Sequence, residues 1–343
     1  MALEGTKSFQ FRQEREAGWQ QLEKLVMQAE KKGIRSLSAA DVFELPHLYK
    51  GALSSLSVAR SISLDKNVVD YLENLTTRAY FLLYGHQRPA GKAFARLMQF
   101  SVPDAVRSLK QEFIVAFVVM FLGVMAGFFL VLQNPDWFFT FMNRELADGR
   151  VPRASAEELK AVIYPAEDKL NSLDIFATQL FTHNSQVGLL AFALGFALGL
   201  PTIWLLFQNG TMLGAFLALH YEKDLLYELG GWLIIHGSTE ILAIILCGAA
   251  GLAIARHYVF PGKLSRMESL AIYGKKAALV AFGCILMFLV AGLLEGFARQ
   301  LVSSDTGRYT IGLGFLFIWA LYFLGVGRNA PEDASDDIGG KAS

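Results

Sequence analysis

Residues 232–254 carry the sequence WLIIHGSTEILAIILCGAAGLAI, which decides the fold class. A bilayer core about 30 Å thick needs roughly 20 helical residues at about 1.5 Å each, so this stretch is long enough to cross a membrane as one helix. It is apolar apart from a short polar run, in which His236 and Glu240 lie four residues apart and share one helix face. The sequence therefore predicts an integral membrane protein.

Further apolar runs predict an all-α, polytopic membrane bundle of about six spans. Four of them pass the same length test cleanly, at residues 113–132, 187–207, 277–297 and 309–327. A sixth run, residues 211–226, is shorter and ends in charged side chains. Hydropathy alone also allows this run to be a re-entrant hairpin.

Charge bias predicts the orientation and the number of spans. Residues 256–276 carry five basic side chains and one acidic one, which is typical of a cytoplasmic loop. Residues 133–186 carry five basic and eight acidic side chains, and are predicted to form an outside loop. An odd number of crossings must separate the two loops, so residues 211–226 are predicted to cross. Six spans in the cytoplasmic membrane then place both termini in the cytoplasm.

The composition excludes several classes of function. Apolar residues make up 53% of the 343, which is too many for an ordinary soluble protein. The 31 basic and 31 acidic residues balance, so no nucleic-acid partner is predicted. The two cysteines, Cys247 and Cys284, both lie in apolar runs, so neither a disulfide framework, nor a metal site, nor a cofactor is predicted.

Residues 1–110 are predicted to form a cytosolic helical region of three or four short helices. Ser38 and Asp41 have the spacing of a helix N-terminus, and Asn67 is a candidate cap for a helix ending near Tyr84. Residues 92–100 mix apolar and basic side chains, which suits either an interfacial helix or a fourth helix of the cytosolic bundle.

Residues 111–328 are predicted to form the transmembrane bundle, including the outside loop at 133–186. Two short helices are expected in the loop, one of them starting at Ser155 with Glu158 in capping-box spacing. Residues 329–343 are polar and are predicted to be disordered. Glycines at three- or four-residue spacing indicate tight helix packing and are compatible with a homodimer.

His236 and Glu240 form the candidate intramembrane polar site, with Gly237 between them. An isolated carboxylate at this depth is costly, so the pair must turn toward the bundle interior. Three interpretations remain open: a structural hydrogen bond that locks helices together, a proton or cation pathway, and catalysis. No catalytic triad or paired-aspartate motif appears in the spans, so no enzymatic activity is predicted.

Other polar residues are candidates to support this site. Asn184, with His183 beside it, is placed at the outer mouth of the second span, and His220 in the third; both histidines are candidates to join His236. Asn209 and Gly210 are predicted to form a tight turn between the second and third spans.

The chain resembles the stage II sporulation protein M family of membrane proteins. The matching segments are residues 11–19, 45–49, 100–107 and 184–199, Thr202, Asn209 with Gly210, His236 with Gly237, Glu240, and residues 248–251. The family's named member is similar to a membrane scaffold that assembles cell-wall-degrading enzymes during engulfment in endospore formation. The resemblance implies a scaffold or assembly component of a cell-envelope complex without enzymatic activity.

The expected partners are the lipid bilayer, a second copy of the chain, and cell-envelope proteins that bind the outside loop or the cytosolic region. The alternative is a transporter or channel in which His236 and Glu240 form a proton or cation site.

Overall fold

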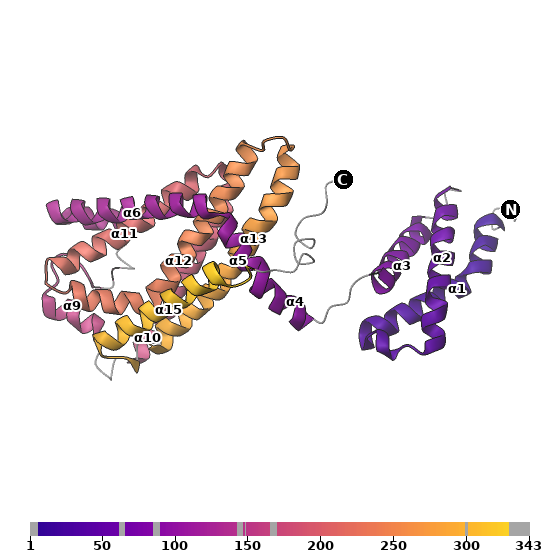
Figure 1. Ribbon diagram of the computed structural model, residues 1–343, viewed down its shortest axis with the longest axis horizontal. Coiled ribbons are helices and arrows are strands. Elements are labelled where there is room, and N and C mark those ends of the chain that lie inside the picture. The colour runs from indigo at the N-terminus through magenta and orange to yellow at the C-terminus, as the bar shows by residue number, and fades with distance from the viewer. Residues whose placement is uncertain are drawn as a thin grey trace. The chain divides into compact units, whose positions relative to one another are not determined.

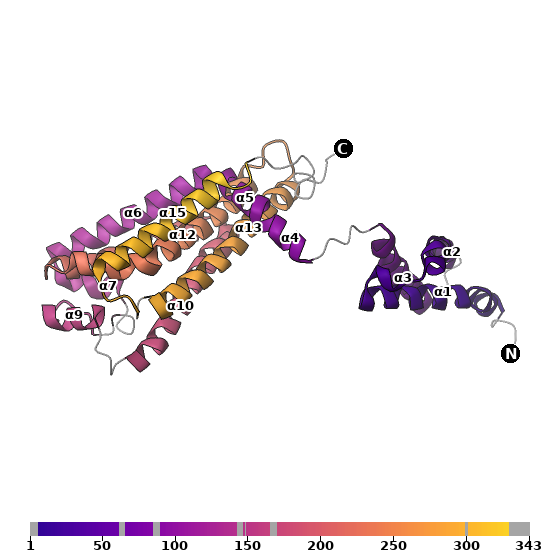
Figure 2. The same ribbon diagram turned by 60° about the horizontal axis from the view of Figure 1, so that its bottom comes forward.

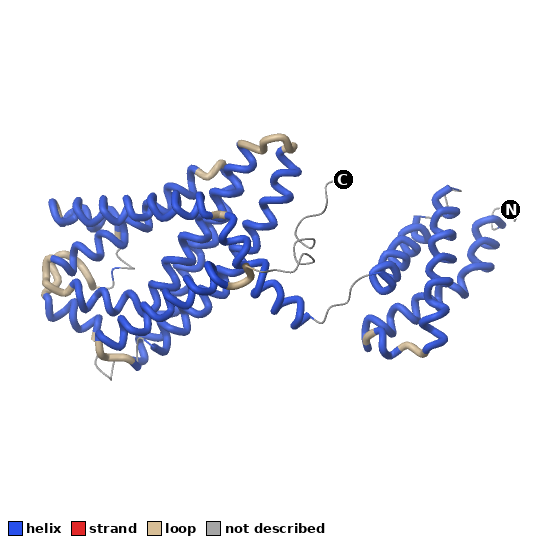
Figure 3. Tube along the Cα trace, viewed as in Figure 1, coloured by secondary structure: helices blue, strands red, loops and turns tan. Residues whose placement is uncertain are grey.

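The computed structural model describes residues 6–61, 66–84, 90–142, 147, 149–164, 170–298 and 301–328. Within these ranges the secondary structure is helical and no strand occurs, which confirms the all-α prediction (Figure 3). The chain divides into two compact units, residues 1–93 and 94–343. The predicted disorder of residues 329–343 lies outside the described residues.

The first unit contains three long helices, α1 (Thr6–Lys32), α2 (Ala39–Ser61) and α3 (Lys66–Tyr84), with a 3₁₀ turn η1 (Ile34–Ser36) before α2 (Figure 1). It has its own apolar core, which includes Trp19, Leu45 and Leu72. The predicted start near Ser38 is confirmed, because Ser38 and Asp41 cap each other's main-chain N–H groups. The predicted helix that ends near Tyr84 is confirmed as α3, whose described part begins at Lys66, and Asn67 lies in its first turn.

A segment that starts at the end of the first unit and continues into the second leads into the bundle. It consists of α4 (Ala90–Arg96), a π-helical turn η2 (Leu97–Ser101) and α5 (Val102–Ser108). The ring of Phe94 meets Phe282 edge-on at 6.5 Å, and the hydroxyl of Tyr322 donates to the carbonyl oxygen of Met98 at 2.6 Å. This segment therefore packs on the bundle, and the alternative of a fourth helix in the N-terminal unit is wrong.

The rest of the second unit is a helical bundle with a partly helical loop. Its elements are α6 (Lys110–Gln133), η3 (Pro135–Trp137), α7 (Phe138–Phe141), α9 (Ala156–Ile163), α10 (Leu170–Ala193), η5 (Leu194–Ala197), α11 (Leu200–Tyr221), α12 (Leu226–Val259), α13 (Arg266–Leu293), η6 (Leu294–Ala298) and α15 (Asp305–Gly325). The central helix is α12, which is largely buried and runs alongside α6, α13 and α15 (Figure 2).

Five of the described helices are long and apolar enough to cross a bilayer: α6, α11, α12, α13 with its extension to Gly296, and α15. This supports a membrane protein with several spans. The orientation and the total of six spans stay predictions.

The predicted spans at 187–207 and 211–226 have the wrong boundaries. Leu198 and Gly199 both adopt left-handed backbone angles, with φ of 63° and 77°, and end the helical path that starts in α10. Residues 200–221 then form one continuous helix, α11, so the re-entrant hairpin is excluded as well. Hydropathy cannot predict the bend at Leu198 and Gly199, because the residues on both sides of it are apolar.

The predicted turn at Asn209 and Gly210 is also wrong, because both residues lie inside α11. Gly210 instead permits a close helix crossing. A Cβ atom there would collide with the carbonyl oxygen of Met120 in α6, and a Cβ on Gly123 would collide with that of Phe207. Small residues at this spacing let two backbones approach closely. These glycines make contacts between two helices of the same chain, so they are not evidence for a homodimer. The homodimer stays a prediction.

The predicted outside loop contains one of the two predicted short helices as a separate element. Helix α9 begins with the predicted capping box, since Ser155 and Glu158 bond each other's main-chain N–H groups. The second predicted short helix does not form a separate element, because the helix that begins at Leu170 continues to Ala193 as α10. Phe138 of α7 is fully buried in an apolar cluster with residues of the bundle, so the start of the loop packs against the bundle.

Candidate functional site

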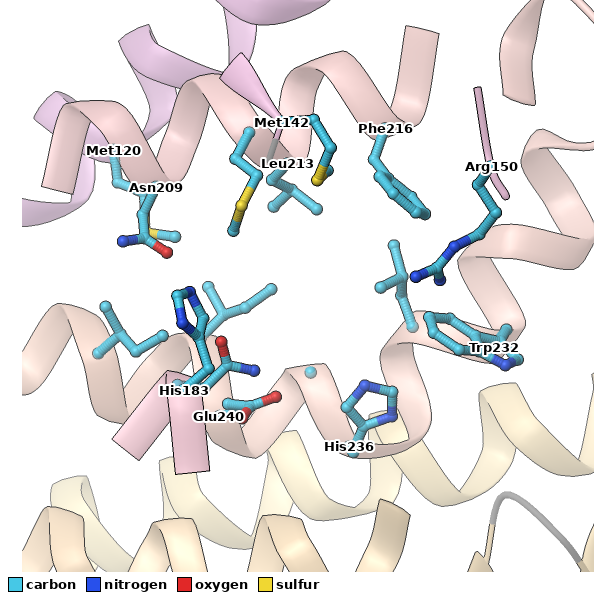
Figure 4. Close-up of a pocket in the computed structure, with 16 residues that line it drawn as sticks. Met120, Met142, Arg150, His183, Asn209, Leu213, Phe216, Trp232, His236 and Glu240 are labelled. Carbon is cyan, nitrogen blue, oxygen red and sulfur yellow. The ribbon is translucent and has the colours of Figure 1, made fainter. Parts of the chain in front are cut away.

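A cavity of about 130 Å³ lies inside the second unit (Figure 4). Side chains from α6, α10, α11 and α12 and from the segment after α7 line it. Much of the wall is made by methionine, leucine, isoleucine and aromatic side chains. The polar side chains on the wall are Arg150, His183, Asn184, Asn209, His236 and Glu240.

Helix α12 supplies one wall of the cavity through residues spaced four apart. Trp232, His236 and Glu240 lie on one face of the helix, and Gly237 also borders the cavity. The ring of His236 meets the indole of Trp232 edge-on at 5.6 Å. Glu240 lies one turn deeper and its relative exposure is only 5%. The polar run in the sequence therefore turns inward, as predicted.

Helix α10 faces Glu240 from across the cavity. Asn184 forms a side-chain hydrogen bond with the Glu240 carboxyl group, and His183 borders the same space. Asn209 of α11 completes this end of the cavity, and its amide also donates to the carbonyl oxygen of Leu205 at 3.4 Å. Three helices thus bring an imidazole, two amides and a carboxyl group to one end.

Arg150, in the segment between α7 and α9, occupies the opposite end and is only 4% exposed. Its guanidinium group lies 4.6 Å from the ring centre of Phe216 and 5.9 Å from that of Trp232. In Figure 4, Arg150 lies at the Phe216 and Trp232 end, and His183 and Asn209 at the other. The sequence analysis missed Arg150, since a basic residue in a loop of mixed charge carries no local signal.

A second carboxyl group lies close to Glu240. Glu295, in η6 after α13, is 1% exposed and near enough for its charge to act on Glu240. The sequence analysis missed it because it sits in the apolar run at 277–297, although an acidic residue in such a run is itself a sign of function.

Three other predicted residues lie away from the cavity wall. Thr202 is buried and donates to the carbonyl oxygen of Ala191 at 2.8 Å. His220 is buried against Phe216, and its Nδ1 lies 2.9 Å from the carbonyl oxygen of that residue. Gly210 packs on α6. Of the two candidate histidines, the structure brings His183 to the cavity with His236.

The donor set suits a proton or a small cation better than a transition metal. Among the described residues, no three His, Cys, Asp or Glu side chains converge on a point where they would hold a metal ion. A carboxyl group bordered by imidazole and amide groups can exchange a proton or contribute oxygen ligands.

Comparison with known protein families places these elements in context. A model of the stage II sporulation protein M family matches residues 116–300, more than half of the chain. The chain belongs to this family. The match covers α10, α11 and α12, which carry most of the cavity wall, and η6 with Glu295.

A second family model, for a domain of unknown function (DUF8413), matches residues 9–85, which lie within the first unit. No curated protein and no solved structure matches the chain. The N-terminal helices and the membrane bundle thus correspond to two different family models.

Proposed function

We propose that the bundle moves protons or a small cation across the cytoplasmic membrane, with both termini of the chain on the cytoplasmic side. The observation that carries this proposal is the cavity in which His183, Asn184, His236 and Glu240 meet inside a set of membrane helices. Ionisable side chains within membrane helices are costly and most often mark ion or proton paths. A purely apolar contact would lock the same helices together without this cost.

The two buried carboxyl groups strengthen the proposal. Glu240 and Glu295 come from different helices, both are buried, and the charge of Glu295 acts on Glu240. Two buried carboxylates that act on each other in a medium of low dielectric constant repel, so the uptake of a proton or a cation at Glu240 relieves the repulsion. Binding and release of that ion is the elementary step of transport.

The position of Arg150 agrees with a closed form of such a path. Its guanidinium lies against Phe216 and Trp232 at the end of the cavity nearest the predicted outside loop. An arginine held against aromatic rings is stabilised by cation–π attraction, and it repels cations at the entrance. Opening would require this residue to leave the rings.

Flux into liposomes tests this function. The purified chain is reconstituted with a trapped pH dye, and a pH step or a Na⁺ or K⁺ gradient is applied. We expect protein-dependent flux that Glu240→Gln abolishes, because the amide keeps the size of the side chain but cannot ionise. Glu222→Gln makes the same chemical change at an exposed position and should leave flux intact. Equal flux in the presence and absence of protein for all ions would exclude transport.

A second candidate function, a scaffold for cell-envelope proteins, is favoured by the surface of the first unit. On α3 the ring of Tyr80 contacts the rings of Phe81 and Tyr84, and Phe81 is 63% exposed. Exposed aromatic clusters are more typical of interaction sites than of bare surface. Neither of the two functions requires enzymatic activity.

In-cell photo-crosslinking tests the scaffold. A photoreactive phenylalanine at Phe81 should capture one or a few defined proteins if the cluster is a docking surface. The same probe at Asn74, an exposed position on the same helix, should not capture them. Identical products from both positions would indicate random contact and would count against the scaffold.

A further inference from the structure

A groove at the opposite end of the bundle from Arg150 belongs to no part of the proposed transport path. Its volume is about 420 Å³, within the range of ligand sites in proteins. The start of α6, the bend before α11 and the end of α12 line it. We propose that this groove binds one anionic phospholipid, with the phosphate at Arg256 and the acyl chains along the apolar wall.

The groove lies at the level where membrane helices end. Arg256 belongs to the last turn of α12, and Glu112 to the first turn of α6. Both helices are candidate spans, so their ends fall where lipid headgroups lie. The loop that follows Arg256 is the basic one that predicts the cytoplasmic side, which is the side richer in anionic lipid.

The geometry of Arg256 fits a phosphate. Its Nη1 donates to Gln111 Oε1 at 2.7 Å and to Glu112 Oε1 at 2.5 Å, and these bonds hold the guanidinium in place. Among the described residues, neither its Nε nor its Nη2 donates to a protein acceptor, and the side chain is 51% exposed. Arginine presents donors in a planar fork that matches phosphate oxygens, so the unused edge is suited to a headgroup.

The rest of the groove fits acyl chains. Its apolar wall includes Val115, Leu198, Val259 and Phe260, which are all exposed in the structure. These side chains surround the arginine on the outer surface of the bundle, where lipid tails would cover them. A free phosphate ion would leave this apolar wall uncovered, so the combination favours a lipid.

The negative charge of Glu112 does not prevent an anionic headgroup from binding at Arg256. Glu112 is only 5% exposed, and one of its oxygens already accepts from Arg256. Exposed basic residues lie at the start of α6, at Lys110, and after α12, at Lys263. The local field therefore remains attractive to an anionic headgroup.

Native mass spectrometry of the full chain in a mild detergent tests the proposal. Phosphatidylglycerol and phosphatidylcholine are added at equal concentrations, and the lipid-bound fractions are compared. We expect the wild-type chain to retain phosphatidylglycerol in preference to phosphatidylcholine. Arg256→Gln should weaken phosphatidylglycerol retention about fivefold, the factor expected for one basic residue at an anionic lipid surface.

Two controls keep the result interpretable. Arg266→Gln removes the same charge from the same side but does not line the groove, so it should lower retention clearly less than Arg256→Gln does. Val259→Trp fills the groove while keeping Arg256, and it should also lower retention. If Arg256→Gln fails to fold because Glu112 is left buried and unpaired, the double variant with Glu112→Gln removes that charge.

Three outcomes would overturn the proposal. They are equal retention of both lipids by the wild type, an equal loss in Arg256→Gln and Arg266→Gln, and unchanged retention in Val259→Trp. The first would show that charge does not select the lipid, the second that lipid associates with the basic end of the bundle only through diffuse charge, and the third that lipid does not occupy the groove. None of these outcomes bears on transport through the cavity, which Glu240→Gln tests separately.

Discussion

The hydroxyl group of Thr202 donates a hydrogen bond to the carbonyl oxygen of Ala191 over a distance of 2.8 Å. Both residues are fully buried, and the bond joins the end of α10 to the first turn of α11 across the bend at 194–199. The last carbonyl groups of a helix have no partner within it. Thr202 therefore satisfies an acceptor that would otherwise be buried without a hydrogen bond.

Replacement of Thr202 by valine should destabilise the bundle by about 1–2 kcal/mol, because the shape is kept while one buried hydrogen bond is lost. The loss can be measured as a lower midpoint of thermal unfolding in detergent. Thr310→Val removes a comparable bond, from the Thr310 hydroxyl to the carbonyl oxygen of Thr306, at an exposed position. An equal effect of both substitutions would show that the bend does not depend on Thr202.

Alanine at Gly123 should disturb the crossing of α6 and α11. A Cβ there would collide with the carbonyl oxygen of Phe207, and main chain cannot move aside as a flexible side chain can. Overpacking of this kind costs about 1–3 kcal/mol.

Gly314→Ala on α15 is the matched control, because a Cβ at that position meets open space. Helix propensity alone then makes the change neutral or stabilising by up to about 1 kcal/mol. Both effects can be read from thermal unfolding monitored by size-exclusion chromatography. Opposite signs for the two glycines are expected, and the same sign would contradict the assigned crossing.

The first unit should lose stability at high pH through Tyr71. Burial, and a hydrogen bond from its hydroxyl to Glu23 Oε2 at 2.8 Å, raise the pKa of Tyr71 from its ordinary value of 10 to about 12. The folded state thus favours the protonated phenol. Its contribution to stability is complete below pH 10 and declines as the pH rises toward 12.

Chemical unfolding of residues 1–84, followed by Trp19 fluorescence, tests this pH dependence between pH 9 and 11.5. The wild type should lose stability with pH more steeply than Tyr71→Phe, which cannot ionise at this position. Tyr80→Phe changes an exposed tyrosine on the same helix and should keep the wild-type slope. Parallel curves for the wild type and Tyr71→Phe would show that Tyr71 ionises equally in the folded and unfolded states.

Local signals predicted much of the fold. The capping pairs at Ser38 and Ser155 form as expected, because they depend on residues three positions apart. The long apolar runs form helices as expected, because length and hydropathy are enough to predict a membrane-spanning helix. The bend at Leu198 and Gly199 could not be predicted in this way, because it depends on two left-handed residues within an unbroken apolar run.

Residue spacing predicted the part of the candidate site that lies on α12, and His183, Asn184 and Asn209 were candidates to support it from other helices. His236 and Glu240 share a face of α12 by their spacing alone. Asn209 was placed in a turn on its turn propensity, but contact with α6 keeps it helical, and it lines the cavity instead. Arg150 reaches the cavity, and Glu295 acts on Glu240, through tertiary packing, which periodicity within a single helix cannot reveal.

Removal of the Arg150 side chain should open the cavity from the side of the predicted outside loop. Gly237→Cys gives a probe on the cavity wall, and it fits because a Cβ there meets only Ile241 at an ordinary 3.5 Å. In a background with Cys247→Ala and Cys284→Ala, a membrane-impermeant thiol reagent should label this cysteine slowly while Arg150 covers the entrance. Arg150→Ala should raise the labelling rate severalfold, since the cation–π contacts with Phe216 and Trp232 are lost.

Arg153→Ala makes the same change at an exposed position of the same loop, and it should leave the labelling rate at its original value. Equal rates with and without the Arg150 side chain would place the entrance elsewhere. Absence of labelling in both cases would leave the polar residues of the cavity as a closed contact between helices. A rate that rises only when Arg150 is removed would identify this residue as the barrier between the cavity and the water on that side of the membrane.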